Sequence, residues 1–272
     1  MKEKVVVITG AAGVLCSVIA EDFAVRGAKV AVLDINENAL KVLEERLSKS
    51  GTVKGYAANV LDKASLENAR SQIERDFGVC DILVNGAGGN NAAATTGEEF
   101  FDLKNDGSVK SFFDLTEQGV NFVFNLNFLG AFLTTQVFAA PMAKRGGGNI
   151  LNISSMNAFT PLTKIPAYSA AKAAVSNFTE WLAVYFSTAK IRVNAIAPGF
   201  FATNQNKTLL YNADGSLTER SEKILRNTPM KRFGKPEELL GAVRLLTDDK
   251  ESGFVTGVVF PIDGGFQAYS GV

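Results

Sequence analysis

The chain contains 272 residues, 46% of them hydrophobic, with 28 basic and 28 acidic side chains and no histidine. The charges balance and no long block carries one sign, which argues against a nucleic-acid-binding surface or a polybasic membrane surface. This length and hydrophobic content predict a single α/β domain, residues 1–272, with a full core. The two cysteines are far apart in the sequence, so we expect no disulfide framework and a reducing compartment.

The N-terminal residues lead into a strand pattern without the cleavage pattern of a signal peptide, and no apolar run approaches membrane-spanning length. The sequence therefore predicts a cytoplasmic protein without a membrane or nucleic-acid partner. We also expect no metal site.

A strand, a glycine-containing turn, a helix and a second strand are predicted within residues 5–33. Residues 5–8 and 29–33 are short apolar runs, with apolar side chains at helical spacing between them. This βαβ unit has the length expected for dinucleotide binding, because Gly10 and Gly13 allow the backbone to approach a pyrophosphate at the helix N-terminus. A lone glycine turn would indicate only a tight loop, but the flanking elements favour cofactor binding.

Asp34 follows the second strand of this unit. A carboxylate there is placed to bond both hydroxyls of an adenosine ribose, and it would repel a 2′-phosphate. No arginine adjoins it, so the sequence predicts NAD, with NADP less favoured.

Strand and helix patterns continue to alternate after this unit. We expect helices over residues 38–47 and 64–77, and strands over residues 53–58 and 81–84. The last of these strands runs into a glycine-rich stretch, residues 85–89, where the backbone could pass close to a flat ligand. The alternation predicts a doubly wound parallel sheet with right-handed crossovers.

Residues 90–116 interrupt the alternation with a polar segment that also carries phenylalanines. A connection this long is usually functional. Because it follows the fourth strand, we interpret it as part of the substrate wall and as a candidate subunit contact. A loop that packs its own phenylalanines explains the pattern equally well.

A long helix is expected over residues 116–143, with Asn127 among apolar neighbours. A polar side chain in such a segment needs a hydrogen-bond partner or a water. An asparagine that is simply satisfied in the core is the alternative.

Three side chains with complementary chemistry come next. Residues 149–154 form a predicted buried strand that leads to Ser155, and residues 167–186 form a predicted helix that carries Tyr168 and Lys172. The tyrosine and the lysine are one helical turn apart and share a face, and the strand end can present the serine to the same point.

These groups suit proton transfer to or from a carbonyl or alcohol. A free phenol has a pKa of about 10, and a neighbouring ammonium is expected to lower the pKa of Tyr168. Tyr168 would then act as general acid or base, and Ser155 would hold the reacting oxygen. The spacing alone is weak evidence, because tyrosines and lysines at helical spacing are common on solvated faces.

The rest of the chain supplies two more strands, a lid and a helix. Residues 192–197 and 258–262 are predicted strands, and residues 236–247 a predicted helix. The polar excursion over residues 200–231 is interpreted as a lid that closes over the site and excludes water.

In combination, the motifs resemble the short-chain dehydrogenase/reductase family over essentially the whole chain. Each motif is weak alone, but their order and spacing are specific. They are Thr9-Gly10, Asp34, Asn59-Val60, Asn85-Gly86-Ala87-Gly88, Asn127, Ser155, Tyr168-x-x-x-Lys172, Pro198-Gly199 with Thr203, and Asp263-Gly264-Gly265. The resemblance implies a Rossmann-type, three-layer fold with a parallel sheet of seven strands.

The resemblance also implies a catalytic tetrad of Asn127, Ser155, Tyr168 and Lys172. In that reading Tyr168 is the acid/base, Ser155 orients the carbonyl, and Lys172 lowers the phenol pKa and binds the nicotinamide ribose. Asn127 supports a water that relays protons to Lys172.

The implied cofactor-binding residues extend along the whole chain. They are Gly10, Gly13, Val14, Leu15, Asp34, Ile35, Asn59, Val60, Asn85, Gly86, Ala87, Tyr168, Lys172, Pro198, Gly199, Phe201 and Thr203.

One departure concerns the family's Thr-Gly-x-x-x-Gly-x-Gly loop, whose last two glycine positions are Val14 and Cys16 here. Gly13 is expected to take over part of the turn. Cys16 could be a redox switch, but a small buried packing residue is the favoured interpretation.

The modified loop, the insertion at residues 90–116 and the run FDLTEQGVNFVFNLNFLG resemble the D-mannonate oxidoreductase (fructuronate reductase) branch of the family. That resemblance implies interconversion of a keto-hexuronate and a sugar acid. The candidate substrate residues are Asn90, Ser155, Asn157 and Tyr168, with Asn91, Asn204 and Gln205 as further groups for sugar hydroxyls and Lys164, Lys207 and Arg232 as unranked partners for a carboxylate.

Other functions remain open at this stage. A 3-oxoacyl thioester reductase or another polyol or ketone reductase fits the same scaffold, because a fold does not determine its substrate. A non-catalytic NAD-sensing protein is the alternative from another class, and the filled tetrad argues against it. Family members commonly form tetramers, so we expect a homo-oligomer, a tetramer or a dimer, with Trp181 in the core or at the subunit interface.

Overall fold

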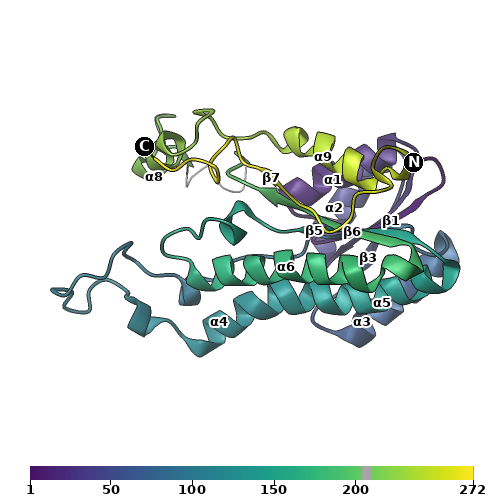
Figure 1. Ribbon diagram of the computed structural model, residues 1–272, viewed down its shortest axis with the longest axis horizontal. Coiled ribbons are helices and arrows are strands. Elements are labelled where there is room, and N and C mark those ends of the chain that lie inside the picture. The colour runs from purple at the N-terminus through teal and green to yellow at the C-terminus, as the bar shows by residue number, and fades with distance from the viewer. Residues whose placement is uncertain (204–209, 272) are drawn as a thin grey trace.

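The computed structural model describes residues 1–203 and 210–271. These residues contain one parallel sheet of seven strands in the order β3-β2-β1-β4-β5-β6-β7, with helices on both faces (Figure 1). The predicted Rossmann-type, doubly wound fold is therefore confirmed. The strands are β1 (Val5–Thr9), β2 (Lys29–Asp34), β3 (Thr52–Ala57), β4 (Ile82–Asn85), β5 (Gly148–Ile153), β6 (Ile191–Pro198) and β7 (Val259–Ile262).

The helices that the sequence predicted lie close to their expected positions, whereas the helix over residues 219–226 was not predicted within the excursion at residues 200–231. The α-helices are α1 (Val14–Val25), α2 (Glu37–Leu47), α3 (Lys63–Asp76), α4 (Glu117–Phe124), α5 (Gly130–Arg145), α6 (Pro166–Tyr185), α8 (Glu219–Arg226), α9 (Leu240–Thr247) and α10 (Asp249–Ser252). Short 3-10 turns are η1 (Ala92–Ala94), η2 (Phe112–Asp114), η4 (Met156–Ala158), η5 (Ser187–Ala189) and η6 (Pro236–Leu239). Helices α2 and α3 begin one residue earlier than predicted, because Asn36 and Asp62 cap them by accepting hydrogen bonds from backbone N–H groups of the first turn.

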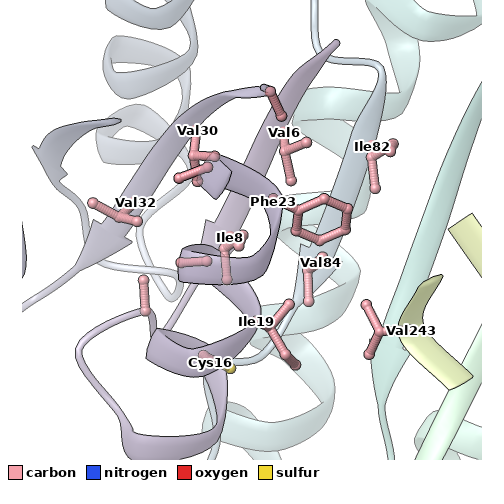
Figure 2. Packing of buried hydrophobic residues seen from close by; sticks show 14 of the residues in the cluster. Val6, Ile8, Cys16, Ile19, Phe23, Val30, Val32, Ile82, Val84 and Val243 are labelled. Carbon is pink, nitrogen blue, oxygen red and sulfur yellow. The ribbon is translucent and has the colours of Figure 1, made fainter. Parts of the chain in front are cut away.

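Alternating residues of β1 fill two apolar layers, one on each face of the sheet. Val6 and Ile8 pack with Ile19 and Phe23 of α1, and this layer extends to Val243 of α9 (Figure 2). The intervening residues of β1 belong to the layer under α3, α5 and α6. A strand buried on both faces reads as a continuous apolar run, which is why this strand was recognisable in the sequence.

The predicted long helix is present but is not uniform. A π-helical turn, η3 (Asn125–Leu129), separates α4 from α5, so that the helical segment runs from Glu117 to Arg145. By length and composition alone this segment is long and apolar enough to cross a membrane, so the expectation that no apolar run approaches that length is wrong. Half of its most apolar window is buried, and the helix packs against α3 and α6 as a core helix of the domain.

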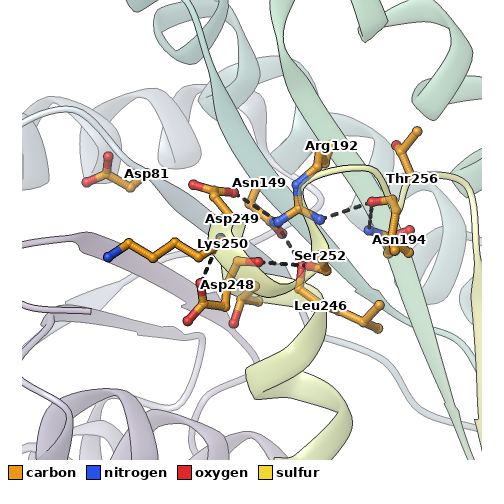
Figure 3. A network of polar contacts seen from close by, with 12 residues as sticks. Asp81, Asn149, Arg192, Asn194, Leu246, Asp248, Asp249, Lys250, Ser252 and Thr256 are labelled. Carbon is orange, nitrogen blue, oxygen red and sulfur yellow. Dashed lines mark hydrogen bonds and ion pairs between the residues drawn. The ribbon is translucent and has the colours of Figure 1, made fainter.

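A polar network closes the amino-terminal edge of the sheet (Figure 3). Arg192 on β6 donates to the carboxylate of Asp249 over 2.9 Å and to the carbonyl of Val255 over 3.0 Å. Asn149 on β5 donates to the carbonyl of Leu246 over 2.9 Å. These bonds attach α9 and α10 to the sheet, which leaves the carboxyl edge of the strands as the open end.

The insertion at residues 90–116 projects from the end of the domain where that open edge lies (Figure 1). It contains η1 and η2, and η1 packs against α4. The ring of Phe113 contacts those of Phe101 and Phe112 edge-on, with centroids 5.6 and 5.9 Å apart. All three rings nevertheless stay more than half exposed, so the contacts among them do not bury these phenylalanines.

Candidate active site

A cavity of about 480 Å³ opens at the carboxyl edge of the sheet, where the strand order reverses between β1 and β4. Ligands of open α/β sheets bind at such reversals. Ser155, Tyr168 and Lys172 line this cavity, as does Asp34 at the end of β2. The structure therefore brings the predicted catalytic groups and the predicted ribose-binding carboxylate into one cleft.

Local structure explains how the three catalytic groups meet. Ser155 follows β5 and caps η4, where its Oγ accepts a hydrogen bond from the backbone N–H of Asn157 over 3.2 Å. Helix α6 begins at Pro166, a residue favoured in the first turn, and presents Tyr168 and Lys172 on one face. The Oγ of Ser154 lies 3.1 Å from the carbonyl oxygen of Lys172, and this hydrogen bond joins the end of β5 to α6.

Burial controls the protonation of Tyr168. Burial raises the pKa of the phenol above its usual value, and the hydrogen bond with Ser155 opposes this increase. The expectation that Lys172 lowers this pKa is not met, because its Nζ lies 5.7 Å from the centre of the Tyr168 ring and donates instead to the carbonyl of Ile153 over 2.8 Å. The phenol is therefore held in its protonated form at neutral pH.

Burial also acts on Lys172, which is 4% exposed. It lowers the pKa of the ammonium from 10.5 to about 8, with a small opposing effect from Cys16. The pKa values of Tyr168 and Lys172 are thus shifted in opposite directions, and each shift favours the neutral form of its group.

Asn127 lies in the π-helical turn and is 1% exposed. Its Nδ2 donates to the carbonyls of Gly89 and Val123 over 2.7 and 2.8 Å, and its Oδ1 accepts from the N–H of Gly89 over 3.2 Å. A Cβ on Gly88 would lie 2.6 Å from this Oδ1 and 3.2 Å from Nζ of Lys172. Asn127 therefore stands directly behind the cavity wall, and its proposed part in a water relay stays a prediction.

The glycine loop fits a pyrophosphate. Gly10 has a φ of +62°, and a Cβ there would lie 2.7 Å from Cα of Ala87, so only glycine allows the loop to pass β4 at this distance. Gly13 caps α1 without a side-chain acceptor, and Val14 and Leu15 of the first helical turn line the cavity. Backbone N–H groups of that turn therefore remain for an anion.

Cys16 occupies the family's third glycine position and packs against Gly86, where a Cβ would collide with its Sγ. The thiol is 5% exposed, and burial raises its pKa to about 12. A protonated, buried thiol of this kind is unreactive. The geometry therefore favours the packing interpretation over the redox switch.

Asp34 is fixed by its neighbours. Its Oδ2 accepts from the N–H of Ala12 over 3.1 Å and its Oδ1 from the N–H of Asn36 over 3.0 Å. Ile35, Asn59 and Val60 line the same cavity. In the part of the chain that the structure describes, Lys172 is the one basic residue lining the cavity, so no cation stands ready for a 2′-phosphate.

Gly86, Ala87, Pro198 and Gly199 also line the cavity, whereas three predicted cofactor contacts do not. Asn85 points into the core, where its Nδ2 donates to Thr135 and Asn152 over 2.9 and 2.8 Å. Phe201 is buried and pairs with Gly234, and Thr203 lies beyond it. Polar residues at strand ends can face either the ligand or the next helix, and the sequence did not distinguish these directions for Asn85.

The candidate substrate residues are more dispersed. Asn157 is buried next to Ser155, and its Oδ1 has no hydrogen-bond partner among the described residues. Asn90 donates to Thr95 over 3.0 Å in the insertion, and Asn91 caps η1. Asn204, Gln205 and Lys207 lie outside the described residues.

Two candidate cations for a carboxylate already have partners. Lys164 donates to the carbonyl of Gly97 over 2.8 Å. Arg232 forms a two-point pair with Glu238, with distances of 2.7 and 2.6 Å. The structure does not bring either side chain to the cavity wall.

Leu126 and Ile153 line the cavity and were not singled out from the sequence. Ile153 ends β5, and strand ends at the carboxyl edge were a usable signal. Leu126 precedes Asn127 in the π-helical turn. Across residues 1–203 and 210–271, no group of three or more Cys, Asp or Glu side chains is arranged to hold a metal ion.

The sequence matches the short chain dehydrogenase family over residues 4–213, and the chain belongs to that family. It is accordingly an oxidoreductase that acts on CH–OH donors.

Two curated relatives are similar over nearly their whole length. An uncharacterised oxidoreductase of Haemophilus influenzae is 58% identical over 273 residues, covering 100% of this chain and 96% of the relative. The uncharacterised oxidoreductase UxuB of Bacillus subtilis is 53% identical over 270 residues, covering 99% and 96%. Among solved structures, "a putative D-Mannonate oxidoreductase" from Haemophilus influenza with bound NAD superposes with a TM-score of 0.97 at 57% identity, covering 100% of this chain and 98% of that one.

Proposed function

We propose that this protein is an NAD(H)-dependent oxidoreductase that interconverts a keto-hexuronate and a sugar acid, D-fructuronate and D-mannonate. The convergence of Ser155, Tyr168 and Lys172 beside a cleft that ends at Asp34 carries the proposal. The similarity to a D-mannonate oxidoreductase with bound NAD supports both the cofactor and the substrate class.

The residues of the cleft fit NAD. The open first turn of α1 would hold the pyrophosphate, Asp34 would accept hydrogen bonds from the adenosine ribose, and Asn59 and Val60 would flank the adenine. The cofactor, when bound, supplies or accepts the hydride.

The protein's own residues handle the oxygen and its proton. Ser155 donates a hydrogen bond to the carbonyl oxygen and holds it beside Tyr168. Tyr168, which burial keeps protonated, donates its proton to that oxygen as the ketone is reduced and takes a proton back as the alcohol is oxidised. Lys172, fixed by the carbonyl of Ile153, would bind the nicotinamide ribose of the cofactor and return a proton to the phenol after the reduction.

The decisive experiment follows NADH oxidation at 340 nm with D-fructuronate, several other keto sugars and an acetoacetyl thioester, and repeats the active case with NADPH. NADH-dependent turnover of fructuronate above all other compounds is the expected result. If the thioester or a neutral keto sugar is turned over instead, the assignment of the catalytic residues stands and the proposal of a hexuronate substrate is wrong. NADH binding without turnover of any compound would favour the NAD-sensing alternative.

We further propose that the protein is a homo-oligomer, a tetramer or a dimer, that uses the outer face of α6. Trp181 and Tyr185 stack there with ring centres 4.8 Å apart while they remain 55% and 63% exposed, and Val184 beside them is 77% exposed. Apolar patches of this kind mark interaction sites. Sedimentation of wild type and of a Trp181→Glu variant tests this proposal, since the variant is expected to shift toward monomers.

The cytoplasm is the proposed compartment. Both cysteines are free and buried, which suits a reducing environment. Cell fractionation with an antibody against the chain would test this, and recovery from a membrane or secreted fraction would overturn it.

A further inference from the structure

Three segments that are distant in sequence meet at one end of the molecule. They are the insertion, the segment that leads into α6, and α8 (Figure 1). The N–H of Thr96 donates to the carbonyl of Lys164 over 2.9 Å, and Nζ of Lys164 donates back to the carbonyl of Gly97 over 2.8 Å. The base of the insertion is therefore bonded to the segment that begins the Tyr168 helix.

The insertion also reaches α8 through an ion pair. Glu99 pairs with Lys223, which is 124 positions further along the chain. The side chain of Glu99 is only 26% exposed and that of Lys223 is 51% exposed. The hydrogen bond from Lys223, then its charge and that of Lys164, lower the pKa of Glu99. Glu99 is thus a carboxylate that pairs with a cation from α8, and the charge of Lys164 also stabilises its ionised form.

The inner face of α8 connects it to the cleft. Ser221 donates from its Oγ to the carbonyl of Leu210 over 2.7 Å, and Ile224 belongs to an apolar cluster with Phe233. Phe200 packs against this cluster and directly follows Gly199, which lines the cavity. A change in the position of α8 would therefore reach the cavity wall through Phe200.

We propose that Glu99 and Lys223 form a clasp that positions α8 at the substrate end of the cleft, so that the insertion acts in substrate binding. Both are positioning residues, since neither lines the cavity. Breaking the clasp loosens α8 and weakens substrate binding, while the part of the cavity lined by the first turn of α1 and by Asp34 is unaffected. The inference rests on the proposed function only for the identity of the ketone.

Four variants and two matched controls test the clasp. Glu99→Gln and Lys223→Gln each remove one charge, the double variant Glu99→Gln/Lys223→Gln completes a cycle, and Glu99→Lys/Lys223→Glu restores the pair with reversed charges. Glu98→Gln and Glu222→Gln remove a neighbouring charge from the insertion and from α8 without touching the pair.

Each single clasp variant is expected to raise KM for the ketone about three- to fivefold, which is the range of a partly exposed ion pair, with KM for NADH and kcat within about twofold of wild type. The double variant should raise KM no more than either single variant does. The reversed pair should restore only part of the loss, because a lysine at position 99 is also repelled by Lys164. Salt should raise KM by a larger factor for wild type than for the double variant, because only wild type has the ion pair to screen.

Hydrogen exchange gives a measurement that does not depend on the substrate. In the NADH complex, backbone amides of α8 should exchange faster in Glu99→Gln than in wild type or in Glu98→Gln, and the reversed pair should return them toward wild type. Unchanged exchange and unchanged KM in both single variants would overturn the clasp. If wild type does not turn over fructuronate but α8 exchanges faster in Glu99→Gln than in wild type, the proposed substrate is wrong and the clasp is supported.

Discussion

Asn127 holds Gly89 by both ends of its side-chain amide, donating to the carbonyl over 2.7 Å and accepting from the N–H over 3.2 Å. This two-point bond fixes the glycine-rich stretch after β4 against the π-helical turn. It places the cavity wall at Gly88 in contact range of both Asn127 and Lys172.

Replacing Asn127 with alanine is expected to destabilise the protein and to reduce turnover. The change leaves both backbone groups of Gly89 without this partner inside the protein, which costs about 1 to 3 kcal/mol of unfolding free energy. Urea unfolding and kcat measure the two effects. Asn125→Ala, an exposed residue in the same turn, is the control and should change neither quantity appreciably. Equal stability of the two variants would contradict the role assigned to this bond.

Tyr168→Phe is expected to remove the proton donor without disturbing the cofactor. Turnover should fall by about 10²- to 10⁴-fold, the contribution typical of a general acid, while the dissociation constant of NADH stays within about twofold. Stopped-flow or steady-state kinetics and NADH fluorescence give the two numbers. Tyr185→Phe, which removes a hydroxyl from an exposed position on the same helix, should behave as wild type. Surviving turnover in the Tyr168 variant would show that another group carries the proton.

Asp34→Asn is expected to weaken NADH binding and to reduce the enzyme's preference for NADH over NADPH. Hydrogen bonds to a charged acceptor contribute about 1.5 to 3 kcal/mol, so KM for NADH should rise about tenfold or more. KM for NADPH should change less, because removing the carboxylate also removes its repulsion of the 2′-phosphate. Glu37→Gln, an exposed change at the start of α2, controls for the loss of a negative charge nearby. An unchanged ratio of NADH to NADPH efficiency would argue against Asp34 as the discriminating residue.

Burial of Lys172 predicts a pH-dependent stability. Its pKa is about 8 in the folded protein, against 10.5 for a lysine exposed to water, so between these values the unfolded state binds more protons than the folded state. Wild-type stability therefore rises with pH across this window through Lys172, by about 2 to 3 kcal/mol in total. Lys172→Met lacks this contribution, whereas contributions from tyrosines and cysteines are common to both proteins.

The measurement is urea unfolding of wild type and Lys172→Met at pH values from 7 to 10.5. The stability of the variant relative to wild type should be greatest below pH 8 and should fall steadily above it. A pH-independent difference would mean that Lys172 keeps its proton in the folded protein.

Much of the architecture was readable from local sequence patterns. Buried parallel strands are continuous apolar runs, and the segments between them have the patterns of helices, so the alternation of elements predicted the doubly wound sheet. The ordered motifs placed Ser155, Tyr168 and Lys172 on one strand end and one helix face, because their spacing is set by covalent geometry and helical pitch. Boundaries moved by about one residue, where a cap rather than the apolar pattern decided the start.

Only the tertiary structure decided the properties of a residue that depend on neighbours from other segments, such as its pKa, the direction of its side chain and its ion pairs. The pKa of Tyr168 is raised rather than lowered because the surrounding chain buries the phenol, and burial is not a property of a short motif. Asn85 faces Thr135 and Asn152 because β4 pairs with β5 and packs against α5. The long apolar helix is a core helix because α3 and α6 pack against it. Glu99 and Lys223 meet across 124 positions, and no local pattern could pair them. The sequence alone determined most helices and strands and the candidate catalytic groups that they carry. Burial and long-range contacts determined the charge state of polar side chains, the direction in which they point and the groups that they contact.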